Sequence, residues 1–129
     1  MEGDRHNRRE IGKQGEDIAC RLLTDKGHII LERNWRSGHL EIDIITCNPD
    51  GIHFVEVKTR KSNIQAPPQD NVDMGKQIRT ARAAKGYLRK TRDRRLRNME
   101  CLFDVVAVTF SEDGVQTEFI EQAFIPLYI

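Results

Sequence analysis

The feature that most restricts the fold of this chain is a pair of alternating segments joined by a short turn. Residues 41–46 (Glu-Ile-Asp-Ile-Ile-Thr) and 52–59 (Ile-His-Phe-Val-Glu-Val-Lys-Thr) alternate polar and apolar side chains, which indicates two strands. Between them, Asn-Pro-Asp-Gly at 48–51 supplies a proline that fixes φ and a glycine that accepts a left-handed backbone. The sequence therefore predicts an antiparallel hairpin.

The length of the turn decides which side chains share a face of this hairpin. An even-numbered loop pairs Asn48 with Gly51 and places Asp43 directly opposite Glu56. The alternate positions then share the other face: Ile42, Ile44, Val55 and Val57. A three-residue loop with a left-handed Gly51 would instead send the two acids to opposite faces, and a shared site would then need a β-bulge.

Two carboxylates placed opposite each other need a reason, because like charges at directly paired positions, about 4.5–5.5 Å apart, are destabilising. A hard divalent cation reverses that sign: Mg²⁺, or Mn²⁺, is held by one or two carboxylates together with waters and substrate phosphate. With the ammonium of Lys58 nearby, Asp43, Glu56 and the carbonyl of Val57 predict a metal-assisted phosphodiester site. The alternative is a solvated cross-strand charge cluster that binds nothing.

The charge of the chain is unevenly distributed. A length of 129 residues fits one domain and the net charge is only +1, yet residues 76–97 hold ten basic side chains against one acid. Nucleic acid is the usual polyanion for such a segment, and a solvated basic helix is the alternative. The side chains expected to contact phosphate are Lys76, Arg79, Arg82, Lys85, Arg89, Arg92, Arg94, Arg95 and Arg97.

Several classes of protein are excluded by composition and motifs. No run is apolar enough to span a bilayer, and the N-terminal residues lack the apolar core of a signal peptide, so we expect a cytoplasmic protein without membrane contact. Three widely spaced cysteines argue against a disulfide framework or a zinc site. We find neither a glycine-rich phosphate loop nor a serine-nucleophile arrangement.

The rest of the chain supplies helices and strands around the hairpin. We expect a flexible basic arm at 1–7 and a single domain at 8–129. Within it we expect helices at 8–26 and, after Asp73 as N-cap, at 74–92, with further strands at 28–36, 101–110 and 115–120. The turn-rich segment 62–72 is expected to cover a site. The order αβββαββ predicts an α/β fold.

Several short motifs, taken together, resemble the YraN-like family of small uncharacterised bacterial proteins, nearly end to end. They are Gly-Lys-Gln-Gly-Glu-Asp-Ile-Ala at 12–19, Arg-Asn-Trp-Arg at 33–36, Glu-Ile-Asp-Ile-Ile at 41–45, Phe-Val-Glu-Val-Lys-Thr-Arg at 54–60, Phe-Asp-Val-Val at 103–106 and Ala-Phe at 123–124. The central pair also resembles the Asp…Glu-x-Lys core of the PD-(D/E)xK nuclease superfamily, in particular archaeal Holliday-junction resolvases. Leu40 stands where the family usually has Gly.

This resemblance implies a restriction-endonuclease-like fold, with a central mixed sheet flanked by helices. It implies Asp43 and Glu56 as metal ligands, and Lys58 as the residue that orients the attacking water or stabilises charge on the phosphate. It also implies Glu16 as a third acid near the metal. From the helical pattern alone, Glu16 lies at the border of the apolar stripe and would otherwise be only a solubilising charge.

The expected function is a metal-dependent DNA endonuclease, with branched or structured DNA as the favoured substrate and DNA favoured over RNA. If it cuts two strands of a branch, a twofold homodimer is the natural architecture. The alternatives are a non-catalytic nucleic-acid-binding protein that retains the nuclease fold, and an adaptor recruited by protein partners through residues 62–72.

Overall fold

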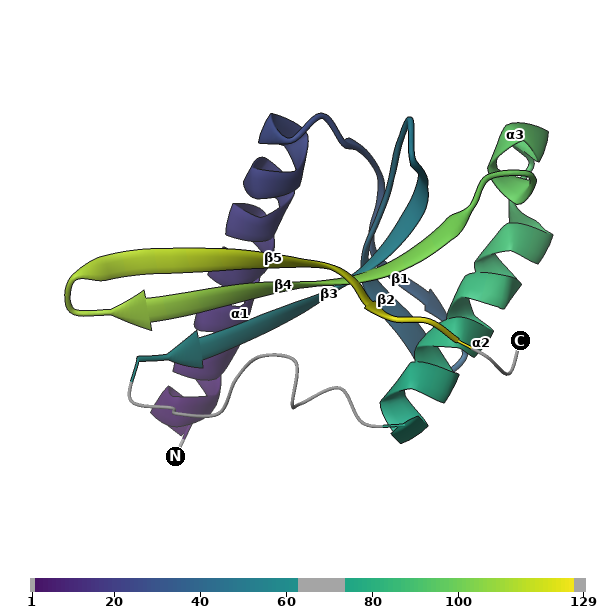
Figure 1. Ribbon diagram of the computed structural model, residues 1–129. Coiled ribbons are helices and arrows are strands. Elements are labelled where there is room, and N and C mark those ends of the chain that lie inside the picture. Colours follow the sequence, from purple (N-terminus) through teal and green to yellow (C-terminus); the bar gives the residue numbers. More distant parts are fainter. Residues whose placement is uncertain (1, 63–73, 127–129) are drawn as a thin grey trace.

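The computed structural model describes residues 2–62 and 74–126, in which a five-stranded mixed sheet carries helices on both faces (Figure 1). The elements are α1 (Glu2–Asp25), β1 (Ile29–Ser37), β2 (Leu40–Asn48), β3 (Gly51–Lys61), α2 (Met74–Lys90), α3 (Arg94–Arg97), β4 (Cys101–Ser111) and β5 (Gly114–Phe124). The expected α/β fold and element order are confirmed, and a short helix, α3, is added before β4.

The strands lie in the sheet in the order in which they occur in the sequence. Neighbouring strands are antiparallel, except for β3 and β4, which are parallel. Parallel neighbours need a crossover connection, and α2 lies within it. β4 is buried along most of its length, as its nearly unbroken apolar sequence predicts.

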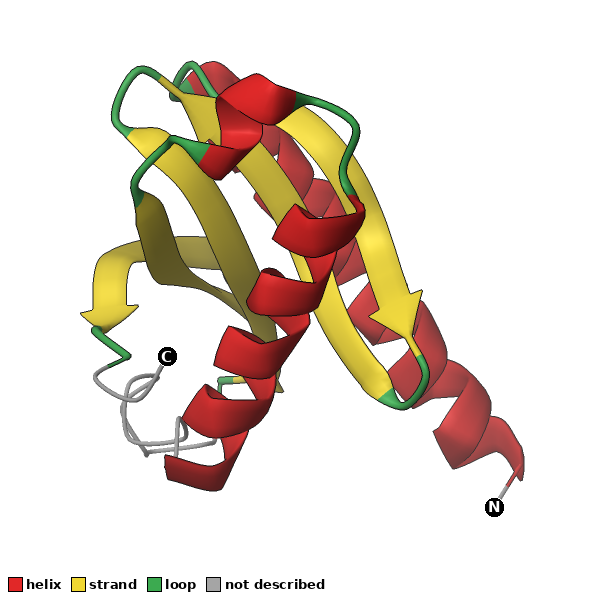
Figure 2. Ribbon diagram, turned by 90° about the vertical axis from the view of Figure 1, so that its right-hand side faces the viewer, coloured by secondary structure: helices red, strands yellow, loops and turns green. Residues whose placement is uncertain are grey.

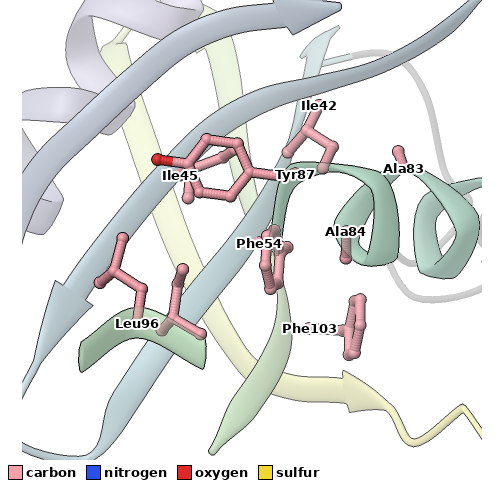
Figure 3. Close-up of a cluster of buried hydrophobic side chains, with 9 residues drawn as sticks. Ile42, Ile45, Phe54, Ala83, Ala84, Tyr87, Leu96 and Phe103 are labelled. Atoms are coloured by element: carbon pink, nitrogen blue, oxygen red, sulfur yellow. The ribbon is translucent and has the colours of Figure 1, made fainter. Parts of the chain in front are cut away.

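Two apolar cores hold the helices against opposite faces of the sheet (Figure 2). Under α1, Ala19 and Leu23 pack on Ile44, Val55 and Val106. Under α2 and α3 lies a larger cluster, rich in aromatic side chains (Figure 3). Its buried members are Ile42, Ile45, Ile52, Phe54, Ala83, Ala84, Tyr87, Leu96 and Phe103.

The hairpin has the even-numbered turn that its sequence predicts. Asn48 pairs with Gly51, and regular pairing continues as far as Ile44 with Val55. The Asn48 side-chain oxygen accepts hydrogen bonds from the N–H groups of Asp50 and Gly51, which fixes the turn. Gly51 has φ +152°, and a Cβ there would overlap the carbonyl of Glu100, so a side chain is excluded on two grounds.

The predicted set of side chains on the apolar face of the hairpin is wrong at one position. Ile44, Val55 and Val57 belong to the core under α1, as expected, but Ile42 packs in the core under α2. Ile42 and Ile45 therefore share a face although they are three positions apart, so the strict alternation fails near Asp43. The period-two argument assumes a regular pleat, and the regular β2–β3 pairing stops at Ile44.

Other differences concern the ends and faces of elements. α1 begins at Glu2 rather than Arg8, so the helix includes residues 2–7, where a flexible arm was expected, although Gly3 and Asn7 have low helix propensity. The helix expected at 74–92 ends at Lys90, and Asp93 is the N-cap of the next helix, α3. On α2, Lys85 is exposed and Tyr87 is buried. Residues 63–73, including Asp73, lie outside the described part.

Candidate functional site

The two acids of the hairpin line one small pocket at the end of the hairpin away from its turn. Asp43 and Glu56 share this pocket, of 60 Å³, with Lys76 and Thr80 from α2. The Asp43 carboxylate accepts a hydrogen bond from the Val57 N–H at 2.9 Å. Beyond the regular β2–β3 pairing, the Asp43 carboxylate thus replaces a backbone carbonyl as the acceptor for the Val57 N–H. This hydrogen bond holds the carboxylate in one orientation.

Asp43 lies in a strongly negative environment. Its pKa is raised to about 6, first by burial and then by the negative charges of Glu16, Glu56 and Glu41, while the hydrogen bond from Val57 acts in the opposite direction. Glu16 on α1 therefore lies within electrostatic reach of the hairpin acids. The structure places Asp43 and Glu56 in one pocket, while Glu16 acts on Asp43 through its charge from α1.

Glu16 reaches the hairpin because α1 packs closely on β3. A Cβ built on Gly15 would overlap Thr59 Oγ1, so only glycine permits this approach. In the described part of the chain, the buried Glu16 Oε1 has no hydrogen-bond partner. An unsatisfied buried carboxylate oxygen costs about 1–3 kcal/mol or more, so a ligand that pairs with it gains correspondingly.

Two ammonium groups lie against Glu56. Lys58 Nζ lies 3.5 Å from Glu56 Oε1, and both side chains are nearly buried, with exposed fractions of 14% and 13%. Lys76 Nζ forms a second ion pair with the same oxygen. Lys76 was predicted as a phosphate contact of the basic segment, but the structure places it in the carboxylate pocket.

The residues present fit a magnesium ion of the kind that keeps several waters. Among the described residues, no group of three or more His, Cys, Asp and Glu side chains is arranged to hold a metal. Asp43, Glu56 and the carbonyl of Val57 would therefore be the protein ligands, with waters and a substrate phosphate completing the shell. The unpartnered oxygen of Glu16 and the raised pKa of Asp43 both favour an added cation here.

The basic segment forms an exposed surface on α2 and α3. Apart from Lys76, the predicted phosphate contacts are all exposed: Arg79, Arg82, Lys85, Arg89, Arg92, Arg94, Arg95 and Arg97. Some also stabilise local structure. Arg95 pairs with the N-cap Asp93 at 3.0 Å, which lowers the pKa of that carboxyl, and Arg97 donates to the carbonyl of Thr91.

A groove beside Glu16 was not predicted from the sequence. Arg9 and Lys13 of α1 and Arg33 of β1 line this open groove of 520 Å³ together with two acids, Glu16 and Asp17, and Arg33 pairs with Asp17 at 2.7 Å. The sequence pattern that could have indicated this groove is the four-residue spacing of Arg9 and Lys13, which places both side chains on one face of a helix. Thr80 was missed as well, because nothing in the hairpin indicates which turn of α2 lies over it.

The mixed sheet flanked by helices defines an α/β protein of the restriction-endonuclease-like class. Residues 15–108 match the family model described as uncharacterised protein family UPF0102, and the chain belongs to this family.

Its relatives cover most of the chain. A UPF0102 protein of Bacteroides thetaiotaomicron is 36% identical over 94% of this chain and 95% of its own length. One from Dictyoglomus turgidum is 38% identical over 92% of this chain and 99% of its own length. One from Moorella thermoacetica is 46% identical over 78% of this chain and 82% of its own length.

Among the described helices, none has the length and apolar character that crossing a membrane requires.

Proposed function

We propose that this protein is a metal-dependent DNA endonuclease, acting on branched or otherwise structured DNA in the cytoplasm. The observation that carries the proposal is the placement of Asp43 and Glu56 in one pocket, within the electrostatic influence of Glu16, whose buried Oε1 has no hydrogen-bond partner among the described residues. A purely structural cluster would be expected to pair that oxygen.

The side chains divide the work of phosphodiester hydrolysis. Asp43, Glu56 and the Val57 carbonyl would hold Mg²⁺ or Mn²⁺, which when bound supplies charge stabilisation on the phosphate and lowers the pKa of a water. Lys58 aligns the attacking water and stabilises negative charge on the phosphate. The Lys76 ammonium, which pairs with Glu56 in this structure, would contact a phosphate oxygen if Glu56 held the cation.

Affinity for DNA comes from exposed basic residues outside the pocket. The arginines of α2 and α3 and those of the groove beside Glu16 contact phosphates and provide binding that is independent of base sequence. If two strands of a branch are cut, a twofold homodimer supplies the two active sites.

Cleavage assays test the proposal. Supercoiled plasmid, single-stranded DNA and a four-way junction are incubated with Mg²⁺, Mn²⁺ or EDTA. We expect metal-dependent cleavage that falls at least about a hundredfold in Glu56→Ala and Lys58→Ala, because each removes a group acting on the reacting phosphate. Glu112→Ala, at an exposed position in the β4–β5 turn, is the control. Activity that survives both site substitutions would assign the cleavage to another centre or to a contaminant.

A second candidate function is a nucleic-acid-binding protein that keeps the fold without cleaving. The ion pair of Lys76 with Glu56 favours it, because an ammonium already neutralises one of the carboxylates. This candidate predicts tight DNA or RNA binding in EDTA and no turnover with any divalent cation.

A further inference from the structure

A second groove lies next to the carboxylate pocket, between the β1–β2 edge and α2. Its volume is 340 Å³. Trp35, Leu40 and Gly86 form its apolar floor, and Arg82, Arg89 and Lys90 are its cationic members. The sequence analysis assigned Arg82 and Arg89 to phosphate binding but gave Trp35 no role beyond the family resemblance.

The floor of the groove is a tryptophan ring held in a fixed orientation. Trp35 is half-buried, and its ring meets Tyr87 edge to face, with centroids 5.4 Å apart and an interplanar angle of 88°. Tyr87 is itself buried and contacts Phe54 in the core under α2, as Figure 3 shows. The contact with Tyr87 therefore holds the indole of Trp35 in one orientation, so the ring offers a preorganised aromatic surface.

The groove exists because residue 86 lacks a side chain. A Cβ built on Gly86 would lie 3.8 Å from Trp35 Cη2, in ordinary contact, so larger side chains would extend over the ring. Glycine inside a helix is less stable than alanine by roughly 0.5–1 kcal/mol. Packing does not require the glycine, since the space for a Cβ is present. A ligand that occupies this space would account for it.

The charges around this floor match a nucleotide. Arg82 and Arg89 are exposed, and Lys90 Nζ bonds Ser37 Oγ at 2.7 Å beside the groove. A flat apolar face bordered by cations is the combination with which proteins bind single-stranded nucleic acid, by stacking the base and pairing the phosphates. We propose that this groove binds one unpaired base of the DNA strand, stacked on Trp35.

The location connects the groove to the proposed cleavage site, on which this inference rests. Leu40 in the groove is adjacent in β2 to Glu41 of the carboxylate pocket. On α2, Thr80 and Gly86 are separated along the helix axis by about 9 Å, at 1.5 Å per residue. That distance corresponds to roughly two or three stacked nucleotides at 3.4 Å each. The preferred substrate therefore has an unpaired base a few nucleotides from the cleaved bond.

Tryptophan fluorescence tests the groove directly, because the sequence contains a single tryptophan. A dye-labelled thymidine octamer and a blunt duplex of equal length are titrated in EDTA, with dye anisotropy and Trp35 emission followed in parallel samples. We expect the octamer to quench the emission and the duplex to leave it unchanged. Gly86→Leu should abolish the quenching and weaken octamer binding on the order of tenfold, the loss of one stacked base. Gln14→Leu, at an exposed position on α1 outside the groove, is the control.

The readouts separate this inference from the proposed function. An anisotropy change without quenching in the wild type, or equal octamer affinity in Gly86→Leu and Gln14→Leu, would overturn the groove and leave the nuclease proposal standing. No anisotropy change for either DNA at low salt would overturn both. Thermal melting of the Gly86→Leu variant distinguishes a filled groove from an unfolded protein, and the wild-type quenching result stands independently of any variant.

Discussion

At the scale of single residues, Asp43 is the group whose ionisation the fold opposes. Its pKa is raised to about 6 from the ordinary 3.8, with burial as the first cause and neighbouring carboxylates as the second. The folded protein therefore binds this proton more tightly than the unfolded chain does. The cost of ionising Asp43 is absent below about pH 4, grows between pH 4 and 6, and is constant above pH 6.

Replacing the carboxylate by a neutral amide should remove that cost. In EDTA at pH 7.5, we expect Asp43→Asn to unfold at a higher denaturant concentration than the wild type. Its free energy of unfolding should be larger by up to about 3 kcal/mol. The amide oxygen still accepts the Val57 hydrogen bond. The difference should vanish at pH 4, where the wild-type carboxyl is protonated. Equal stability of the two proteins at both pH values would show that Asp43 is not in the negative environment described.

At the scale of elements, close packing of α1 on the hairpin brings Glu16 to the site. Gly15 allows this approach, since a Cβ there would overlap Thr59 Oγ1. Gly12 lies in the same helix, three residues earlier, and among the described residues no atom lies within 4 Å of a Cβ built there. The chain thus offers a matched pair of helical glycines that differ in what surrounds them.

Alanine substitution at these two glycines should have opposite effects. Gly15→Ala should destabilise the protein by about 1–3 kcal/mol through overpacking, and it should move Glu16 away from Asp43. Gly12→Ala should leave stability unchanged or raise it by up to about 1 kcal/mol through helix propensity. Thermal and denaturant unfolding measure both. If Gly15→Ala were as stable as Gly12→Ala, α1 would not pack on Thr59 as described.

The hairpin and β4 could be predicted from the sequence because their signals are local. The Asn-Pro-Asp-Gly turn fixed the pairing of Asn48 with Gly51, and the apolar run of β4 indicated a strand covered on both faces. The burial of Asp104 against His53, at 2.5 Å, could not be predicted, because the two residues come from neighbouring strands far apart in the sequence.

The candidate site was predicted in part for the same reason. The hairpin pattern alone pointed to Asp43, Glu56 and Lys58. By contrast, the contact of Lys76 with Glu56 and the approach of Glu16 depend on how α2 and α1 pack over the sheet. Glu16 was indicated only through the family resemblance, and Lys76 only as a member of a basic segment.

At the scale of the whole molecule, positive charge lies on the exposed arginines of α2 and α3 and on Arg9 and Lys13 beside Glu16. Binding that depends on phosphate contacts releases counterions and weakens steeply with salt. The affinity of this protein for DNA should therefore fall steeply as the salt concentration rises.

Removing one phosphate contact should change that dependence in a defined way. The logarithm of DNA affinity should fall linearly with the logarithm of salt concentration, and Arg79→Ala should reduce the magnitude of the slope by about 1. The effect should be the same for unrelated base sequences. Lys26→Ala, an exposed residue at the end of α1, is the control for a general loss of positive charge. Fluorescence anisotropy from 50 to 300 mM NaCl, roughly the range over which such contacts weaken, measures the slopes. A wild-type slope near zero would argue against phosphate binding.

The central claim is that Asp43 and Glu56 together bind a divalent cation at a phosphodiester. Binding of Mn²⁺ to the pure protein, followed by electron paramagnetic resonance with and without a nuclease-resistant phosphorothioate oligonucleotide, tests it most directly. We predict that Mn²⁺ binds to the wild type and that the oligonucleotide strengthens this binding. The binding should also strengthen from pH 5 to pH 7.5, because Asp43 loses its proton over this range. We predict that binding weakens at least about tenfold in Glu56→Gln. Absence of binding under all these conditions, or equal binding by Glu56→Gln, would contradict the account.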